Sequence, residues 1–318
     1  MKQKWLVLIA LVLAAGCGPK PQSSEPQASP DSQPAERQKV IGASLLTQSH
    51  QFYRELVAAM EDEAKKHNFI LRIQYAEFNG SKQVNQLETF SQQGVDAIIV
   101  SPKDSAGIAP AIDDVRAEGI PVFTVDIAAH NADVVSHIAS DNVLGGRLIG
   151  EFLAKELNGK GKVAIIDQPE TASVQERVAG FEQALSAFPE ITIVQRAPGG
   201  GVRDKAMRAA QDVLQANPDL NAIFGINDDS ALGALAALES AGLQEKIFIV
   251  GYDGTPEARD AILGGTALKA DTVQHPAEIG REAINVIAKH FAGEEVPKVV
   301  PVRVDIIDKA SLEAEQKG

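Results

Sequence analysis

Cysteine is almost absent from this sequence, and several common catalytic motifs are missing. Cys17 is the only cysteine among 318 residues, so no disulfide can form within the chain. The six histidines show none of the close spacings typical of a zinc site, so we expect neither a bound metal nor another cofactor. The phosphate-binding pattern G-x-x-x-x-G-K-S/T and the nucleophile pattern G-x-S-x-G do not occur, which disfavours nucleotide hydrolases and serine hydrolases.

Positive charge is also scarce. The chain carries 30 Lys and Arg against 43 Asp and Glu, which gives a net charge of −13. A nucleic-acid surface needs clustered basic side chains, so we expect no nucleic acid as a partner. Hydrophobic residues make up 44% of the chain, enough to bury the cores of two α/β domains of ordinary size.

The N-terminal segment has the features of an export signal. Lys2 and Lys4 precede the apolar run Trp5–Ala15, which is too short to span a bilayer and is typical of a secretory signal peptide. Small residues then precede Cys17, a pattern that resembles the cleavage site of bacterial lipoproteins. The resemblance implies a signal peptide over residues 1–17 and acylation of Cys17, which would anchor an exported protein to a membrane. An ordinary secretory peptide with a chance cysteine is the alternative.

Residues 18–38 have the composition of a tether. They include five prolines and four serines and no apolar periodicity, which predicts a disordered segment with an extended tendency. At ~3.1 Å per residue, this segment could reach roughly 60 Å from a membrane surface.

From residue 39 onward, short apolar runs alternate with amphipathic stretches. Continuous apolar runs predict strands buried on both faces, and their alternation with helices predicts parallel sheets built from βαβ units. There are too many units for one sheet, so we expect an α/β fold with two doubly wound parallel-sheet lobes. The strand candidates are Val40–Ala43, Leu71–Ile73, Ala97–Val100, Pro121–Val125, Val163–Ile166, Ala222–Phe224 and Ile247–Val250.

Polar residues at or just beyond these strand ends are the candidate functional positions. Open parallel sheets bind ligands at the carboxyl ends of their strands, and two such sheets facing each other would form a cleft. The candidates on this rule are Ser44, Ser101, Asp126, Asp141, Asn227, Asp253 and Gln274.

Four segments are similar to the periplasmic sugar-binding proteins of the ribose and galactose type. They are Val134–Gly146, Asn227–Ala234, Gly251–Pro256 and Gln274–Gly280, and the similarity extends over about residues 39–303. The resemblance implies the type I periplasmic binding protein fold, with one lobe of residues 39–140 plus 275–303 and a second lobe of residues 141–274 plus 304–318. Three crossings between the lobes would act as a hinge. Regulators of the lac-repressor type share these lobes, but they carry a DNA-binding helix-turn-helix where this chain has a signal and a tether.

The resemblance also implies the roles of charged residues in a sugar site. Asp126 and Asp253 match carboxylates that bind hydroxyls, although each could instead cap a following helix. Arg177 matches an arginine that forms forked hydrogen bonds with the ligand, and its alternative is a solvated helix charge.

Neutral residues complete the expected site. Phe52 and Tyr53 match an aromatic pair that covers the sugar ring, and core packing is their alternative. The remaining expected contacts are Ser44, Ser101, Asn227, Tyr252 and Gln274. Three positions depart from the ribose pattern: Ile127 replaces an arginine, Ser101 an asparagine, and Gly201 a stacking phenylalanine. The ligand class therefore stays open between a pentose, a hexose, a polyol and a related small polar molecule.

Three functions follow from this site. The preferred one is a monomeric binding protein that delivers its ligand to the permease and ATPase of an ABC importer, without catalysis. The second is a sensor subunit that docks on a chemoreceptor or a sensor kinase. The third is a hydrolase that uses Asp126 and Asp253 as an acid–base pair, which the missing nucleophile and metal motifs disfavour.

Overall fold

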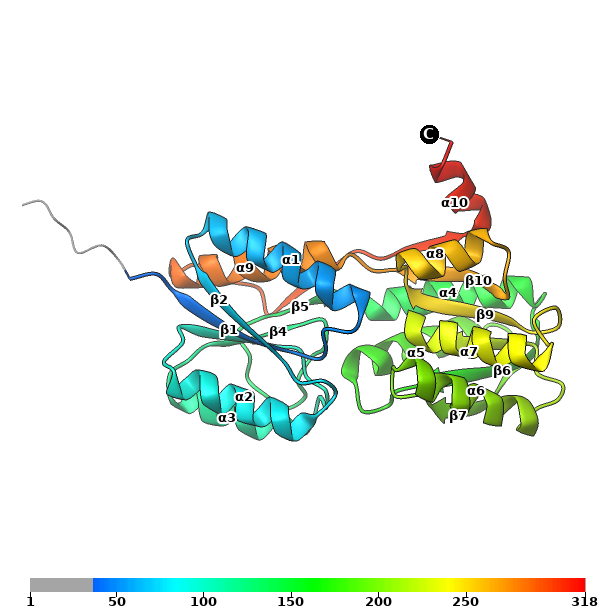
Figure 1. The fold of residues 1–318 in the computed structure, drawn as a ribbon, viewed down its shortest axis with the longest axis horizontal. Helices are drawn as coiled ribbons and strands as arrows, with labels where there is room; N and C mark the ends of the chain where they lie inside the picture. The colour runs from blue at the N-terminus through cyan, green and yellow to red at the C-terminus, as the bar shows by residue number, and fades with distance from the viewer. Residues whose placement is uncertain (1–36, 318) are drawn as a thin grey trace, which may run out of the picture. The chain divides into compact units, whose positions relative to one another are not determined.

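Two six-stranded sheets organise the structure, a computed structural model that describes residues 37–317 (Figure 1). Sheet A has the strand order β11 (Val299–Val302), β5 (His137–Ser140), β4 (Val122–Val125), β3 (Ala97–Val100), β1 (Val40–Leu45) and β2 (Ile70–Tyr75). Sheet B has the order β12 (Asp305–Asp308), β10 (Leu268–Val273), β9 (Phe248–Asp253), β8 (Ala222–Gly225), β6 (Lys160–Asp167) and β7 (Glu190–Pro198).

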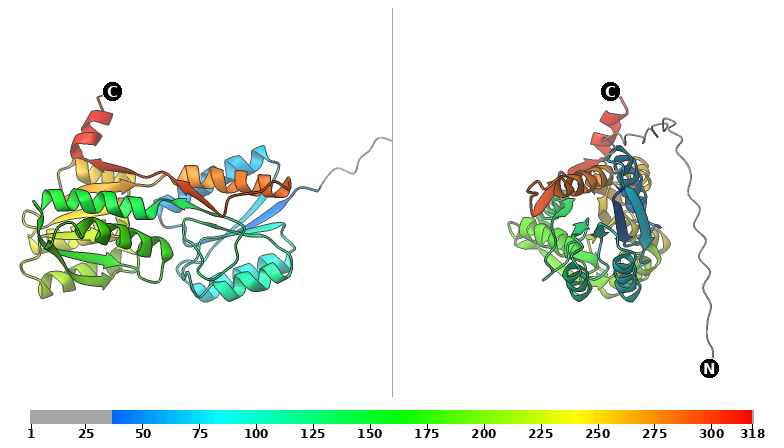
Figure 2. Two further views of the ribbon diagram at one scale, coloured as in Figure 1. Left: turned by 180° about the vertical axis from the view of Figure 1, so that it is seen from behind. Right: turned by 90° about the vertical axis from the view of Figure 1, so that its left-hand side faces the viewer.

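Helices cover both faces of each sheet. We call sheet A and its helices lobe A; its helices are α1 (Gln51–Lys66), α2 (Gly80–Gln92), α3 (Ala109–Ala117) and α9 (Pro276–Phe291). We call sheet B and its helices lobe B; its helices are α4 (Asn142–Glu156), α5 (Ala172–Leu185), α6 (Arg203–Ala216), α7 (Asp228–Ala241), α8 (Pro256–Leu263) and α10 (Lys309–Glu315). In lobe A, α1 and α9 share one hydrophobic cluster with the sheet, and α2 and α3 share another on the opposite face (Figure 2).

The sequence pattern explains the central strands. Every residue of β3, β4 and β8 is buried, because each strand lies inside its sheet with helices on both faces. The edge strand β7 has only two buried residues, Ile191 and Ala197, in its nine positions. The predicted α/β fold with two doubly wound sheets is confirmed.

One strand departs from the parallel pattern. All pairings in sheet A are parallel, whereas β12 runs antiparallel to β10 at the edge of sheet B. The reason is the direct connection: β11 belongs to sheet A, and only two residues later the chain enters sheet B as β12. No crossover helix lies between them to return the chain to a parallel direction.

The chain passes between the lobes at three places. It leaves sheet A after Ser140 at the end of β5, returns after Val273 at the end of β10, and enters sheet B again between Val302 and Asp305. Side chains tie the last two passages together, since His275 Nε2 lies 2.7 Å from Asp305 Oδ2, to which Arg303 Nη1 also donates at 2.6 Å. Among residues 37–317, no helix combines the length and apolar character that a membrane span requires.

Candidate ligand-binding cleft

A cavity lies where the carboxyl ends of the strands of both sheets face each other. Lobe A contributes Phe52 and Asp126 to its wall, and lobe B contributes Arg177 and Asp253. Seven of the ten residues expected at the site line this cavity, and they are Phe52, Tyr53, Asp126, Arg177, Asn227, Asp253 and Gln274. The fold therefore brings together residues that lie up to 222 positions apart in the sequence. The strand-end rule indicated Asp126, Asn227, Asp253 and Gln274 among them, and the family resemblance indicated Phe52, Tyr53 and Arg177.

Asp126 is oriented by hydrogen bonds with buried side chains of lobe A. It follows β4 directly, is 6% exposed, and has a positive φ of 63°. Tyr53 Oη donates to Asp126 Oδ2 at 2.6 Å and lies 2.8 Å from Ser101 Oγ. Burial raises the pKa of Asp126, while the positive charge of Arg177 and these hydrogen bonds oppose the increase. The carboxylate is thus oriented by Tyr53, and Ser101 supports Tyr53.

Asp253 is the last residue of β9, which ends three residues beyond the strand Ile247–Val250 expected from the sequence. Gln274 Nε2 donates to its Oδ1 at 2.7 Å, and the Asp228 amide donates to its Oδ2 at 3.4 Å. It does not cap α8, because the N-cap of that helix is Thr255. Burial and then the negative charge of Asp228 raise the pKa of Asp253 well above its usual range.

Arg177 is a buried residue rather than a solvated helix charge. It is 4% exposed, and its guanidinium lies 4.0 Å from the centre of the Tyr252 ring. Nε donates to Asn142 Oδ1 at 2.9 Å, and Nη1 donates to the Ile226 carbonyl at 2.9 Å. Because these contacts fix its plane, Arg177 presents a pre-oriented donor to the cavity.

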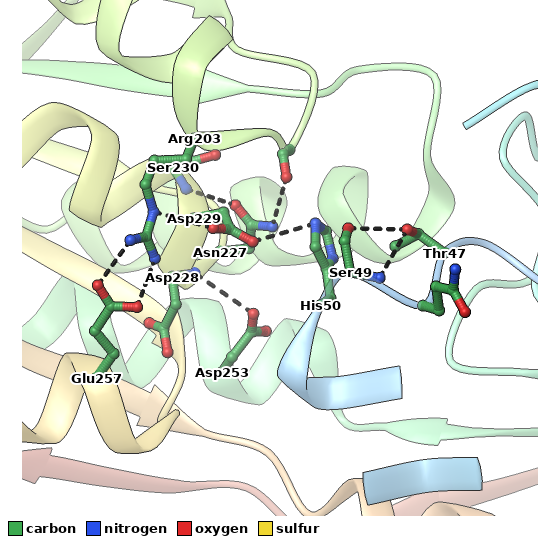
Figure 3. Close-up of polar contacts among 12 residues, drawn as sticks. Thr47, Ser49, His50, Arg203, Asn227, Asp228, Asp229, Ser230, Asp253 and Glu257 are labelled. Atoms are coloured by element: carbon green, nitrogen blue, oxygen red, sulfur yellow. Dashed lines mark hydrogen bonds and ion pairs between the residues drawn. The ribbon is translucent and has the colours of Figure 1, made fainter. Parts of the chain in front are cut away.

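Asn227 has two structural bonds in addition to its place on the cavity wall. As the N-cap of α7, its Oδ1 accepts from the Ser230 amide at 2.9 Å, and its Nδ2 donates to the Gly201 carbonyl at 3.2 Å (Figure 3). One amide N–H remains for a ligand.

Phe52 and Tyr53 satisfy both interpretations of the aromatic pair. They line the cavity, and their rings also belong to the core of lobe A, with centroids 5.3 Å apart.

Four candidate residues lie elsewhere. Ser44 is buried beside α2 and donates to Gln86 Oε1 at 2.7 Å, while Ser101 and Tyr252 lie behind Tyr53 and Arg177. Asp141 is exposed and caps α4, accepting from the Leu144 amide at 2.9 Å. Ser101 and Asp141 follow strands, and Ser44 and Tyr252 are the second-last residues of β1 and β9. Their side chains contact groups within the lobes or a helix end.

Several lining residues were not identified from the sequence. Gln168, Thr171 and Ser173 surround the start of α5. Gln168 comes directly after β6, so the strand-end rule could have found it. Leu46, His50, Val174 and Ile226 also line the cavity, as does Ile127, which was expected where the ribose pattern has an arginine.

A second cavity of about 270 Å³ adjoins the first, the inner cavity, which has about 40 Å³; the two share His50, Phe52 and Asp253. His50 of lobe A points toward Asp229 of lobe B, with Nε2 and Oδ2 3.2 Å apart (Figure 3). Arg203 bridges Asp229 and Glu257 beside this contact. His50 therefore joins the two lobes at the entrance to the inner cavity.

The lobes also touch near the start of α5. Lys103 Nζ lies 2.8 Å from Glu170 Oε1, and the Ser105 amide donates to the Glu170 carbonyl at 3.3 Å. The Ala172 amide donates to Ser105 Oγ at 2.9 Å, so a residue of lobe A caps a helix of lobe B. The structure thus holds the lobes in contact on both sides of the inner cavity.

The cavity wall has the chemistry of a site for a small hydroxylated molecule. Carboxylates accept from hydroxyls, a fixed guanidinium donates to them, and aromatic rings cover apolar C–H surface. Within residues 37–317, no group of His, Cys, Asp and Glu is arranged to hold a metal ion. Fold and site together define a two-lobed binding protein with its ligand position between the lobes.

Comparisons with known proteins agree with this class. A family model described as a periplasmic binding protein domain matches residues 41–295, and the chain belongs to this family. It is 34% identical over 270 residues to the ribose import binding protein RbsB of Salmonella typhimurium, covering 85% of this chain and 90% of the relative. It is 31% identical to the xylitol-binding protein of Mycolicibacterium smegmatis, covering 84% and 76%.

Solved structures show the same fold. The myo-inositol binding protein of Caulobacter, bound to myo-inositol, superposes with a TM-score of 0.82 at 30% identity, covering 89% of this chain and 97% of that one. These relatives are binding proteins, so the chain belongs among binding proteins and not among enzymes that use Asp126 and Asp253 for hydrolysis.

Proposed function

We propose that this protein captures a small sugar or polyol between its lobes and delivers it to the permease and ATPase of an ABC importer. The observation that carries the proposal is the inner cavity, where Asp126, Arg177 and Asp253 meet from both lobes with their side chains fixed by buried partners. Relatives named for ribose, xylitol and myo-inositol support a hydroxylated ligand.

Capture follows from the position of the site. A ligand that contacts both lobes binds more tightly when the lobes are together than when they are apart, so binding shifts the protein toward the closed form. The three passages between the lobes would supply the hinge, dividing the chain into residues 39–140 plus 275–303 and residues 141–274 plus 304–318. The closed monomer would then be the form that the importer recognises.

Export and anchoring are part of the proposal. Residues 1–17 would direct export, and acylated Cys17 would hold the protein at a membrane, with residues 18–38 as the tether; these residues, apart from Arg37 and Gln38, lie outside the described part of the chain. Labelling with radioactive palmitate should mark the native protein and not a Cys17→Ser variant. Equal labelling of both would contradict the anchor.

Thermal unfolding tests ligand binding. A ligand at 100 times its Kd adds about 2.7 kcal/mol to the free energy of unfolding, which raises the midpoint by roughly 5 °C or more in a protein of this size. We expect such a rise with one member of a panel of pentoses, hexoses and polyols. Asp253→Ala should abolish it, because a charge-assisted hydrogen bond contributes about 1.5–3 kcal/mol.

Asp260→Ala, which changes an exposed aspartate on α8, is the matched control and should retain the rise. A cooperative native protein that responds to no sugar or polyol would exclude this ligand class.

A further inference from the structure

Three polar atoms of the inner cavity wall have no hydrogen-bond partner within residues 37–317. They are Gln168 Nε2, Thr171 Oγ1 and Gln274 Oε1, and all three are buried from solvent. Their residues line the same cavity. Buried polar atoms are almost always paired, so unpaired ones in residues that line a cavity point to groups that a bound molecule would satisfy.

Thr171 occupies an N-cap position, where a threonine hydroxyl normally accepts a hydrogen bond from a backbone amide of the helix. It is the N-cap of α5, yet its side chain makes no capping hydrogen bond. The Ala172 amide at the start of α5 is instead bound by Ser105 Oγ of lobe A at 2.9 Å. With the lobes in contact, the Thr171 hydroxyl therefore makes no capping hydrogen bond, and its residue lines the cavity.

Gln168 occupies space that a glycine leaves open. A Cβ atom added at Gly201 would lie 2.4 Å from Gln168 Oε1 and 3.6 Å from Asn227 Nδ2. Gly201 also has a φ of +67°, which side chains rarely adopt. Any side chain at position 201 would displace the Gln168 amide, so Gly201 and Gln168 form a matched pair that keeps this amide beside Asn227.

The facing wall of lobe A is mixed. Leu46 and Ile127 offer no donor or acceptor side-chain atom there, whereas Asp126 and His50 do. Of the three unpaired atoms, Gln168 Nε2 and Thr171 Oγ1 belong to the lobe B wall around the start of α5, and Gln274 Oε1 belongs to the passage from β10 to α9.

We propose that Gln168 and Thr171 bind one hydroxyl of the ligand and act as specificity-determining residues that reject molecules lacking it. A hydroxyl both accepts and donates, so it can accept from Gln168 Nε2 and donate to Thr171 Oγ1. The ligand class is a fully hydroxylated sugar or polyol rather than a deoxy sugar. The inference rests on the proposed function and adds that the same cavity distinguishes fully hydroxylated ligands from deoxy ones.

The test is calorimetric titration of the full chain in mild detergent. D-ribose, xylitol and myo-inositol are the probes, followed by the mono-deoxy derivatives of the tightest binder. We expect one derivative to bind the native protein about 10- to 100-fold more weakly than its parent. The hydroxyl that this derivative lacks is the one that would pair with Gln168 and Thr171. In Gln168→Met and Thr171→Val, that difference should shrink to a few-fold or less.

Unliganded unfolding temperatures distinguish recognition from structure. Both variants should unfold at the native temperature or above, because each removes a buried polar atom that has no partner in the described chain. Gln183→Leu alters an exposed glutamine of the same helix, and it should leave binding and selectivity unchanged.

Two outcomes would count against the inference in different ways. If the native protein binds a probe but Gln168→Met and Thr171→Val discriminate its derivatives as the native protein does, the inference is wrong and the proposed function stands. If the folded native protein binds none of the probes or any other sugar or polyol, the proposed function fails and the inference fails with it.

Discussion

Asp271 on β10 is a fully buried acid whose pKa responds to the charges of Asp228 and the cavity residue Asp253. Its exposed fraction is 0%, and burial together with the negative charges of Asp228 and Asp253 raises its pKa well above the usual range. The unfolded chain holds this proton only up to a pKa of about 3.9. Between that value and the raised one, the folded protein binds more protons than the unfolded chain, so the free energy of unfolding falls as pH rises.

Asp271→Asn should therefore stabilise the unliganded protein, and the gain should grow with pH. Asparagine has nearly the shape of aspartic acid, but it does not titrate, so folding no longer requires a proton to be bound at position 271. We expect a midpoint at pH 8 at least roughly 2 °C above the native one, with a smaller difference at pH 5. Scanning calorimetry of both proteins across this range measures it, with Asp114→Asn on the exposed side of α3 as the control. A stabilisation independent of pH would contradict the retained proton.

Individual site residues could be predicted where the backbone alone determines their position. Asp126, Asp253 and Gln274 lie at strand ends, and the parallel sheets bring those ends to one edge. Ser44 also lies at a strand end, yet its side chain turns to Gln86 of α2, a partner that is distant in the sequence. Side-chain direction depends on such tertiary contacts, which strand periodicity does not record.

At the scale of elements, α4 and α5 approach unusually closely through glycines. A Cβ added at Gly146 of α4 would lie 1.9 Å from the carbonyl oxygen of Arg177, and one added at Gly180 would lie 2.0 Å from the carbonyl of Val143. This approach brings Arg177 against Asn142 and Tyr252. The helix contact is therefore part of what orients the guanidinium.

Gly146→Ala should weaken both folding and binding. Separating α4 from α5 costs about 1–3 kcal/mol for overpacking, and displacement of Arg177 should lower ligand affinity by about tenfold or more. Unfolding and titration of the same preparation measure the two effects. Gly80→Ala is the control, since a Cβ there would meet no atom within 4 Å. Native affinity in a destabilised Gly146→Ala protein would show that the helix contact does not position Arg177.

Elements were predictable to different extents for physical reasons. Strands such as β3 and β8 are apolar throughout because they are buried on both faces, and such runs are conspicuous in the sequence. The direction of β12 could not be predicted from the sequence, because it depends on a two-residue connection between the sheets and not on the polarity of the strand's residues. The short strand Asp305–Asp308 also alternates weakly, with only Ile307 buried.

At the scale of the whole molecule, we expect His50 to link the proposed closure of the lobes to pH. With the lobes in contact, His50 Nε2 lies 3.2 Å from Asp229 Oδ2, and burial lowers the pKa of His50 despite the opposing charge of Asp229. Glu77 also raises this pKa, and Arg54 lowers it further. When the lobes separate, the ring becomes exposed and its pKa returns to about 6.5. The open form then binds a proton more readily than the closed form.

Protonation of His50 should consequently lower ligand affinity in mildly acidic solution. Closure is fully favourable above the open-form pKa and weakens as pH falls below it, so one proton changes Kd by at most about tenfold between pH 7 and 5.5. His50→Gln keeps a donor toward Asp229 but does not titrate, and its Kd should increase less over this range. With the lobes in contact the pKa values of Asp126 and Asp253 are raised, so acidification acts on closure through these carboxyls in the opposite direction. That contribution is present in both proteins, so the difference between them isolates the imidazole. His67→Gln, at the far end of α1, should follow the native curve.

If His50→Gln and the native protein lose affinity in parallel, protonation of His50 does not oppose closure, and the contact with Asp229 joins the lobes without making them sensitive to pH.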